Sequence, residues 1–164
     1  MSISEQVTAH LPYLRRFARA TTGSQKSGDS YVASTLEAIL ADPTILPSNL
    51  SVRVALYRTF LKIVNSIKLN DRSSADVSQP RLDAAKRNLG ALAPRARQAF
   101  LLVAVEEFSP QEAAQILDVD DTKLEKLIDE AGREIARQLA TDVVIELHRR
   151  LPVAHQTLGL AKMA

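Results

Sequence analysis

Residues 112–131, EAAQILDVDDTKLEKLIDEA, decide the fold of the second half of the chain and raise a question about its function. Two helical patterns are separated by a short turn, which is the arrangement of a helix-turn-helix. In a DNA-binding protein of this kind, the second helix lies in the major groove, close to the phosphates. Here that helix carries carboxylates, which repel phosphates: Asp121, Glu125, Asp129 and Glu130.

The residues just before this motif mark the beginning of its first helix. Ser109, Pro110 and Glu112 combine an N-cap serine, a proline at the first helical position and a glutamate three residues after the cap, which is a complete capping box. We therefore predict a helix that begins at Pro110. The helix after the turn has one apolar face over four turns, formed by Leu124, Leu127, Ile128, Ala131, Ile135 and Leu139.

The first half of the chain contains three further helical patterns. The apolar spacing predicts a helix over residues 4–21, in which Pro12 could introduce a kink, and a second helix over residues 32–42. The segment between them, GSQKSGD (residues 23–29), is interpreted as a turn. Ser51 is of the residue type that caps helices, and the third helix after it has the apolar residues Leu56, Phe60, Ile63, Val64 and Ile67.

Between the halves, the sequence LNDRSSADVSQP has few large apolar residues and is rich in Ser and Asp, the composition of a flexible linker. Ala85, Leu89 and Leu92 indicate a short helix after it, and a further helix runs from Pro94 to Glu107. We predict an all-α fold of two small helical lobes. The expected bounds are 1–69 for the first lobe, 70–82 for the linker, 83–140 for the second lobe and 141–164 for a tail.

Composition and charge narrow the classes of function. The 164 residues are 46% hydrophobic but only 4% aromatic, so the core must be built mainly from aliphatic side chains. The absence of cysteine excludes disulfides and thiolate chemistry and favours a reducing compartment, and no segment has the features of a signal peptide or membrane span. We therefore expect a cytoplasmic protein. The net charge of +2 hides an asymmetry, since residues 1–70 hold 8 basic and 4 acidic side chains while residues 83–140 hold 8 and 11.

The sequence offers poor material for a catalytic, metal or cofactor site. His10, His148 and His155 do not have the spacing of metal ligands and are interpreted as surface or structural residues. The glycines of GSQKSG are followed by Asp29 where a phosphate-binding loop needs lysine. The acidic pair Glu106–Glu107 is interpreted as solvated or capping. We expect no enzyme activity and no cofactor.

The run LAPRARQAFLLVAVEEFSPQEAAQILDV, residues 92–119, resembles the carboxy-terminal promoter-reading domain (sigma4) of extracytoplasmic-function sigma factors. The first half is similar to the sigma2 domain of the same proteins, with HLPYLRRFARATTG opening it and VALYRTFLKIVNSI as its later core helix. The resemblance covers residues 1 to about 140 and implies two lobes that are sigma2-like and sigma4-like.

The departures from that family lie in the turn and the reading helix. Asp118 replaces the usual turn glycine, which it can do because Asp tolerates left-handed backbone geometry. Glu125, Leu127, Glu130 and Gly132 stand where the family commonly has basic residues. Each phosphate contact contributes roughly 0.9 to the slope of the logarithm of the binding constant against the logarithm of the salt concentration. Without the basic residues these contacts are lost, so promoter binding is not expected.

This combination resembles the sigma-like domain of the PhyR family, regulators of the bacterial general stress response. The motifs EAAQILDV, EAGREIA, HLPYLRRFARA and IARQLATDVVIE all match that family's pattern. The resemblance implies an anti-anti-sigma factor, which imitates a sigma factor and sequesters a NepR-type anti-sigma factor. The stress sigma factor is then released. A monomer that forms a one-to-one complex is expected.

In the PhyR family a phosphorylatable receiver domain follows the sigma-like domain. Val143, Val144 and Ile145 are interpreted as the beginning of its first strand, but the continuation ELHRRLPVAHQTLGLAKMA does not match a receiver. We therefore expect these 164 residues to bind constitutively, whether a receiver was removed or is naturally absent.

The resemblance places the expected partner contacts on both lobes, as apolar grooves with charged rims. Leu127 is the sharpest candidate, because a DNA-reading helix would not expose a leucine there; core packing and a solvated acidic face are the ordinary alternatives. The candidates are Leu14, Phe17 and Phe60 in the first lobe, Phe108, Leu124 and Leu127 in the second, and the acidic rim Glu125, Asp129 and Glu130.

Two other functions compete with this reading. A genuine extracytoplasmic-function sigma factor would bind promoter DNA and RNA polymerase, which a basic reading helix would have supported. A generic two-lobed helical interaction module would bind some other protein. Binding of an anti-sigma factor separates the hypotheses.

Overall fold

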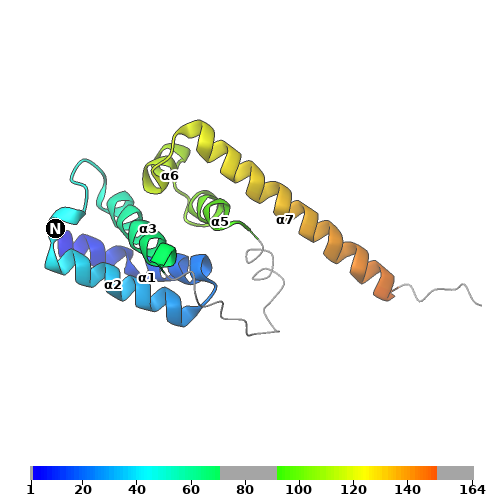
Figure 1. Cartoon of the computed structure of the whole chain (residues 1–164), viewed down its shortest axis with the longest axis horizontal. Coiled ribbons are helices and arrows are strands. Elements are labelled where there is room, and N and C mark those ends of the chain that lie inside the picture. Colours follow the sequence, from blue (N-terminus) through cyan, green and yellow to red (C-terminus); the bar gives the residue numbers. More distant parts are fainter. Residues whose placement is uncertain (1, 71–91, 151–164) are drawn as a thin grey trace, which may run out of the picture.

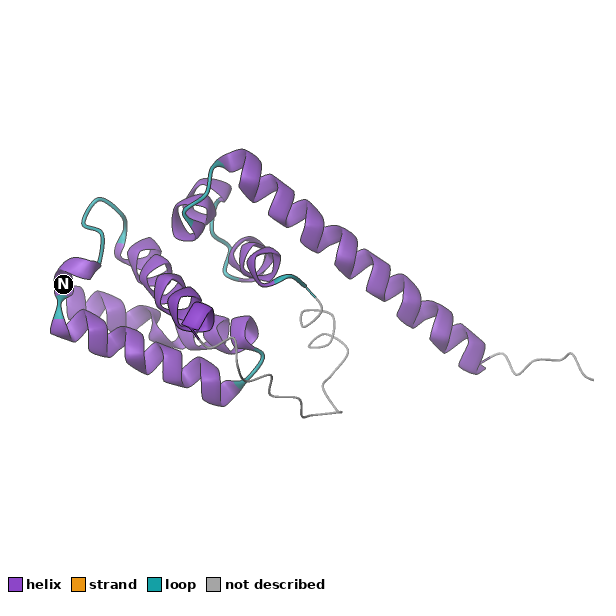
Figure 2. Ribbon diagram, in the orientation of Figure 1, coloured by secondary structure: helices purple, strands orange, loops and turns teal. Residues whose placement is uncertain are grey.

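A computed structural model describes residues 2–70 and 92–150, and every regular element in these two ranges is helical (Figures 1 and 2). The all-α prediction is therefore confirmed. The first lobe consists of α1 (Ile3–Thr22), α2 (Gln25–Ala41), the 3₁₀ turn η1 (Pro43–Ile45) and α3 (Val52–Asn70). The second consists of α5 (Pro94–Phe100), the π-helical η2 (Leu101–Val105), α6 (Pro110–Leu117) and α7 (Asp121–Arg150). No helix in these ranges is long and apolar enough to cross a membrane.

Helix α1 is continuous through Pro12 and is closed at both ends by local signals. Ser2 and Glu5 form a capping box, in which the Glu5 amide donates to the Ser2 hydroxyl at 3.2 Å and the Ser2 amide to the Glu5 carboxylate at 2.7 Å. Gly23 ends the helix in the left-handed conformation with φ of 75°, which glycine adopts without strain.

The segment GSQKSGD is not the turn that we predicted, because α2 already begins at Gln25 with Ser24 as its cap. Gly28 lies where α2 meets α1, and a Cβ at this position would stand 2.8 Å from the Arg19 backbone nitrogen. The glycine is thus required for close helix packing and not for a turn. Sequence alone gives the same signal for both roles.

Helix α3 begins as predicted and forms the centre of the first lobe. The Val54 amide donates to the Ser51 hydroxyl at 3.3 Å, which is an N-cap. The Phe17 ring of α1 packs between two aromatic rings of α3, at 5.2 Å from Tyr57 and 6.0 Å from Phe60. One hydrophobic core runs through both lobes, so the lobes are packed together and not independent.

The predicted helix from Pro94 to Glu107 is interrupted in the structure. After Phe100 the backbone widens into the π-helical η2, and Glu107 adopts a left-handed conformation with φ of 56°. The helix-turn-helix that follows is confirmed: Ser109 and Glu112 form the capping box, and Asp118 has the left-handed geometry expected of it, with φ of 55°.

Helix α7 does not stop near residue 140 but continues to Arg150 (Figure 1). The prediction of a strand at Val143, Val144 and Ile145 is wrong, since these residues are helical and about half exposed. The helical pattern of the second lobe simply continues through them. The predicted linker was 70–82, and its first residue, Asn70, still belongs to α3. Residues 71–82 of that linker, the helix signal at Ala85 and Leu89, and the tail after residue 150 lie outside the described residues.

Candidate functional site

The expected apolar contacts of the first lobe are core residues. Leu14, Phe17 and Phe60 have 0%, 1% and 0% of their surface exposed. In this conformation they shape the lobe from inside and no partner reaches them. The helical spacing that singled them out serves packing, which was the ordinary alternative.

The apolar candidates of the second lobe are buried as well, and this corrects the expectation for Leu127. Leu127 is only 4% exposed, because with Leu124 and Ala131 it forms the inner face of α7, a helix that packs against α5 and α6. Phe108 is 2% exposed and lies against the first lobe. Their role as direct contacts stays a prediction that would require the packing to open.

The acidic candidates are exposed, as a contact surface requires. Asp121, Glu125 and Asp129 follow one another at four-residue intervals along the outer side of α7, and we call these three residues the acidic stripe. Glu130 lies beside them and is also exposed. Asp121 lies in the first turn of α7, where a carboxylate is favoured, but the like charges of Glu125 and Asp129 four residues apart destabilise the helix slightly, so helix stability does not explain that pair.

The two lobes meet at a cluster around Glu106, which sequence analysis had interpreted as solvated or capping. We call Glu106, Arg16, Arg53 and Tyr57 the Glu106 cluster. Arg16 donates to Oε1 of Glu106 through Nε at 3.1 Å and Nη2 at 2.9 Å, and the Tyr57 hydroxyl donates to Oε2 at 2.9 Å. Arg53 donates to the Glu106 backbone carbonyl and lies 3.9 Å over the Phe108 ring.

Electrostatics in the Glu106 cluster favour a neutral Tyr57 phenol. Burial and the neighbouring Glu106 carboxylate raise the pKa of Tyr57 far above its ordinary value of 10.0. Tyr57 therefore keeps its proton and remains a hydrogen-bond donor. Glu106 itself is buried, and a buried carboxylate is stable only when it is paired and hydrogen-bonded as it is here.

A second polar contact joins the lobes at the helix-turn-helix. Arg58 of α3 donates to the Gln115 carbonyl and, at 2.7 Å, to the Asp118 carboxylate. The Asn65 side chain accepts a hydrogen bond at 3.1 Å from buried Gln98 of α5. The charge asymmetry between the two halves of the sequence is the signal that could have revealed these contacts, since basic residues of the first lobe bind acidic residues of the second.

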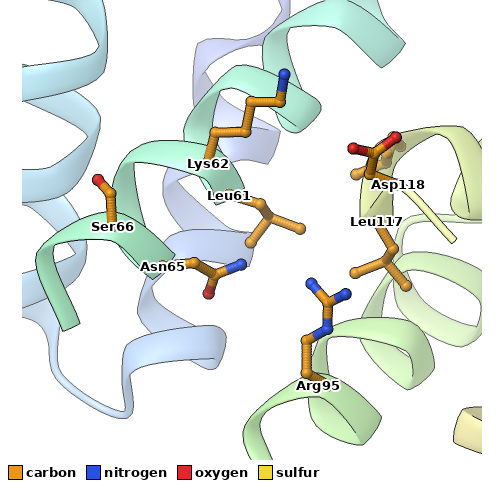
Figure 3. Close-up of a pocket in the computed structure, with 8 residues that line it drawn as sticks. Leu61, Lys62, Asn65, Ser66, Arg95, Leu117 and Asp118 are labelled. Atoms are coloured by element: carbon orange, nitrogen blue, oxygen red, sulfur yellow. The ribbon is translucent and has the colours of Figure 1, made fainter. Parts of the chain in front are cut away.

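Beside these contacts the two lobes enclose a pocket of about 340 Å³, which we call the interlobe groove (Figure 3). Leu61, Ile116 and Leu117 form its floor, but each is only 2% exposed, so they offer little apolar surface to a partner. Lys62 of α3 and Arg95 of α5 are exposed cations on its two sides, and Arg95 extends into the space between α3 and Leu117. The remaining lining residues are Asn65, Ser66 and Asp118.

None of these residues forms a catalytic constellation, and the described residues contain no group of three or more His, Asp or Glu side chains that could hold a metal ion. His10 is partly buried, which lowers its pKa with a further contribution from Arg53. The arrangement is suited to holding another protein chain, with a groove between the lobes, cations on its two sides and a separate row of carboxylates.

Two helical lobes, of which the second is a helix-turn-helix with an acidic second helix, define the class of sigma-like proteins. Comparison with protein families gives the same class, because the sigma2 domain of PhyR matches residues 7–61 and the sigma-like domain of the response regulator PhyR matches residues 89–138. The chain belongs to the PhyR family.

Individual relatives support this membership. The chain is 49% identical over 145 residues to the phyllosphere-induced regulator PhyR of Methylorubrum extorquens; the match covers 88% of this chain but 53% of that protein, so the chain spans about half its length. In the PhyRSL–NepR complex from Sphingomonas sp. Fr1 the similar chain is 37% identical, with a TM-score of 0.71 and 100% of both chains covered. In the complex of anti-anti-sigma factor PhyR with anti-sigma factor NepR from Bartonella quintana, the similar chain is 36% identical with a TM-score of 0.70. The match covers 90% of this chain and 60% of that chain.

Proposed function

We propose that the chain is an anti-anti-sigma factor, which imitates a sigma factor, sequesters a NepR-type anti-sigma factor one-to-one and so releases the general stress response sigma factor. The acidic stripe carries the proposal, because the helix that would read DNA presents carboxylates to the phosphates. Relatives of this chain have been solved in complex with NepR. The function is one of binding, without chemistry, in the cytoplasm where sigma factors act.

The proposed organisation keeps residues 1–69 and 83–140 as the two binding lobes, with residues 70–82 as their linker. Residues 141–150 extend the last helix of the second lobe beyond this boundary. The lobes act as one binding surface, because polar contacts and a common core join them.

The interlobe groove is the proposed seat for one helix of the partner. Lys62 and Arg95, the exposed cations on its two sides, would pair with carboxylates of that helix, while the buried apolar floor supports the groove from beneath. Glu125, Asp129 and Glu130 are the proposed contacts for a basic segment of the same partner. The buried candidates Leu14, Phe17, Phe60, Phe108, Leu124 and Leu127 would support both surfaces from beneath.

The test is a calorimetric titration of the chain with the NepR-type anti-sigma protein of the same genome. Lys62→Glu combined with Arg95→Glu reverses both cations of the groove, and Lys26→Glu on the exposed surface of α2 is the matched control. We expect tight one-to-one binding that the groove variant weakens at least about tenfold and the control leaves within about twofold. Leu127→Glu is not a clean test, because it would bury a carboxylate in the core of the second lobe.

A second pair of substitutions tests the acidic surface. Glu125→Lys combined with Asp129→Lys should weaken the same complex, because it replaces the proposed contacts for a basic segment with like charges. Absence of any complex with the unmodified chain would overturn the proposal. Sequence-specific binding of promoter DNA by the unmodified chain would establish a genuine sigma factor instead.

A further inference from the structure

Among the ion pairs that join the described residues of the two lobes, the Glu106 carboxylate is the most deeply buried charge. Its side chain is 1% exposed, whereas its partner Arg16 is 54% exposed. Both side-chain donors to it, Arg16 and Tyr57, belong to the first lobe, while Glu106 itself belongs to the second. A small rotation of the lobes that keeps the interface dry would leave the carboxylate and the Tyr57 hydroxyl unpaired, which is strongly unfavourable.

The backbone around Glu106 is shaped to direct it into the first lobe. The Glu106 amide donates to the Leu101 carbonyl at 2.9 Å, which closes the π-helical η2, and the Phe108 amide donates to the Leu102 carbonyl at 3.0 Å. Between them Glu107 is left-handed, which is costly for a residue with a side chain. Such a conformation persists when surrounding contacts require it, and the contacts here are Glu106 on Tyr57 and Phe108 on the same ring at 4.9 Å.

Helix α3, which holds Glu106 through Tyr57 and Arg53, also forms one wall of the interlobe groove, and α6, which follows Glu106 in the chain, forms the other. On α3, Tyr57 contacts Glu106, and Leu61 and Asn65 line the groove one and two turns further along, about 6 and 12 Å along the helix axis. On the other side, α6 begins four residues after Glu106 and supplies Ile116 and Leu117. The position of Glu106 therefore contributes to the width of the groove, together with the Arg58–Asp118 and Gln98–Asn65 contacts at the groove itself.

We propose that Glu106 is a positioning residue for partner binding: it holds the lobes at the spacing that forms the groove and does not itself touch the partner. The proposal rests on the proposed function. We call the arrangement in which the lobes are packed together docked, and the share of molecules in it the docked fraction. Only docked molecules present both walls of the groove, so the apparent Kd equals the intrinsic Kd divided by the docked fraction. A docked fraction of about one tenth would therefore weaken the complex about tenfold.

The experiment measures the docked fraction and the affinity separately. The chain has no cysteine, so Lys26→Cys on α2 and Lys126→Cys on α7, both exposed, place one spin label on each lobe. Double electron–electron resonance then gives the distribution of distances between lobes in the unmodified background and in the Glu106→Ala background. Calorimetry with unlabelled chains and the NepR-type anti-sigma protein gives Kd. Glu107→Gln is the matched control, because it removes the same charge from the exposed neighbour.

We expect Glu106→Ala to broaden the distribution of distances between the two spin labels. It should also raise Kd by a factor equal to one divided by the docked fraction. Glu107→Gln should change neither quantity. Glu106→Gln and Tyr57→Phe each keep part of the cluster, so their distances and Kd should lie between those of the unmodified chain and of Glu106→Ala. If circular dichroism shows that Glu106→Ala fails to fold, these two variants take its place. Unchanged distances, or open lobes with an unchanged or lower Kd, would overturn the proposal. Absence of binding by the unmodified chain would overturn the proposed function, while the distances would still decide whether Glu106 positions the lobes.

Discussion

Neighbouring arginines of α1 take part in two contacts of different character. Arg15 and Arg19 lie four residues apart on one side of the helix, and both bind Asp29 of α2, whose side chain is 31% exposed. Arg16 binds Glu106 of the second lobe, whose side chain is 1% exposed. The first contact joins two helices of one lobe at the surface, and the second joins the lobes through a buried carboxylate.

The difference shows that two arginine–carboxylate contacts of the same chemistry can contribute differently to the stability of the protein. Solvent screens the exposed pairs at Asp29, and such pairs contribute little. The buried pair at Glu106 is stable only while its geometry is kept. Each contact is also accompanied by a non-ionic one, which is the close backbone approach at Gly28 in the first case and the Phe108 ring in the second.

Truncation of the aromatic ring at the lobe interface should have the largest effect. Phe108→Ala removes a ring that is 2% exposed, packs against Tyr57 and lies under Arg53. We expect the free energy of unfolding to fall by about 3–5 kcal/mol, as for other buried aromatic side chains. Urea denaturation followed by circular dichroism measures it. Phe100→Ala, at a half-buried position of the same lobe, should cost less, and equal losses would show that the interface has no special weight.

A smaller effect is expected where α1 and α2 approach each other. In Gly28→Ala the new Cβ would stand 2.8 and 2.9 Å from the Arg19 backbone nitrogen and Cα, so the helices must move apart. We expect a loss of about 1–3 kcal/mol, typical of overpacking. The matched control is Gly132→Ala, since a Cβ there meets nothing within 4 Å. It should stabilise α7 by about 0.5–1 kcal/mol. The same sign for both variants would contradict the close-contact interpretation.

Local signals were sufficient to predict most of the helices and the helix-turn-helix. The capping box at Ser109 and Glu112, the cap at Ser51 and the left-handed Asp118 all depend on a few adjacent residues, and all were found as predicted. Their energetics do not require knowledge of the rest of the chain. The all-α class therefore followed from local signals, while the family came from the resemblance of several motifs to known proteins.

The candidate site was less accessible from the sequence, because it depends on contacts between distant residues. Glu106 is 90 residues from Arg16 and 49 from Tyr57, so nothing near it distinguishes it from the exposed Glu107. The apolar spacing that selected Leu127 is the same for a core and for a binding face, and the structure assigns it to the core. Only the acidic stripe could be placed on the surface from sequence, since unpaired carboxylates are rarely buried.

The exposed contact at Asp29 should show the smallest effect, and only in acid. Hydrogen bonds from Arg19 and Arg15 lower the pKa of Asp29 from its ordinary value of 3.8 to about 2. Because the pKa is lower in the folded state, the stabilisation by Asp29 is complete above pH 3.8 and disappears as the pH falls through about 2. Asp29→Asn should therefore show a small, constant loss of stability near neutral pH and converge on the parent chain in strong acid. Urea denaturation between pH 7 and pH 2 measures this, and a difference that stays unchanged down to pH 2 would mean that Asp29 contributes through packing and not through its charge.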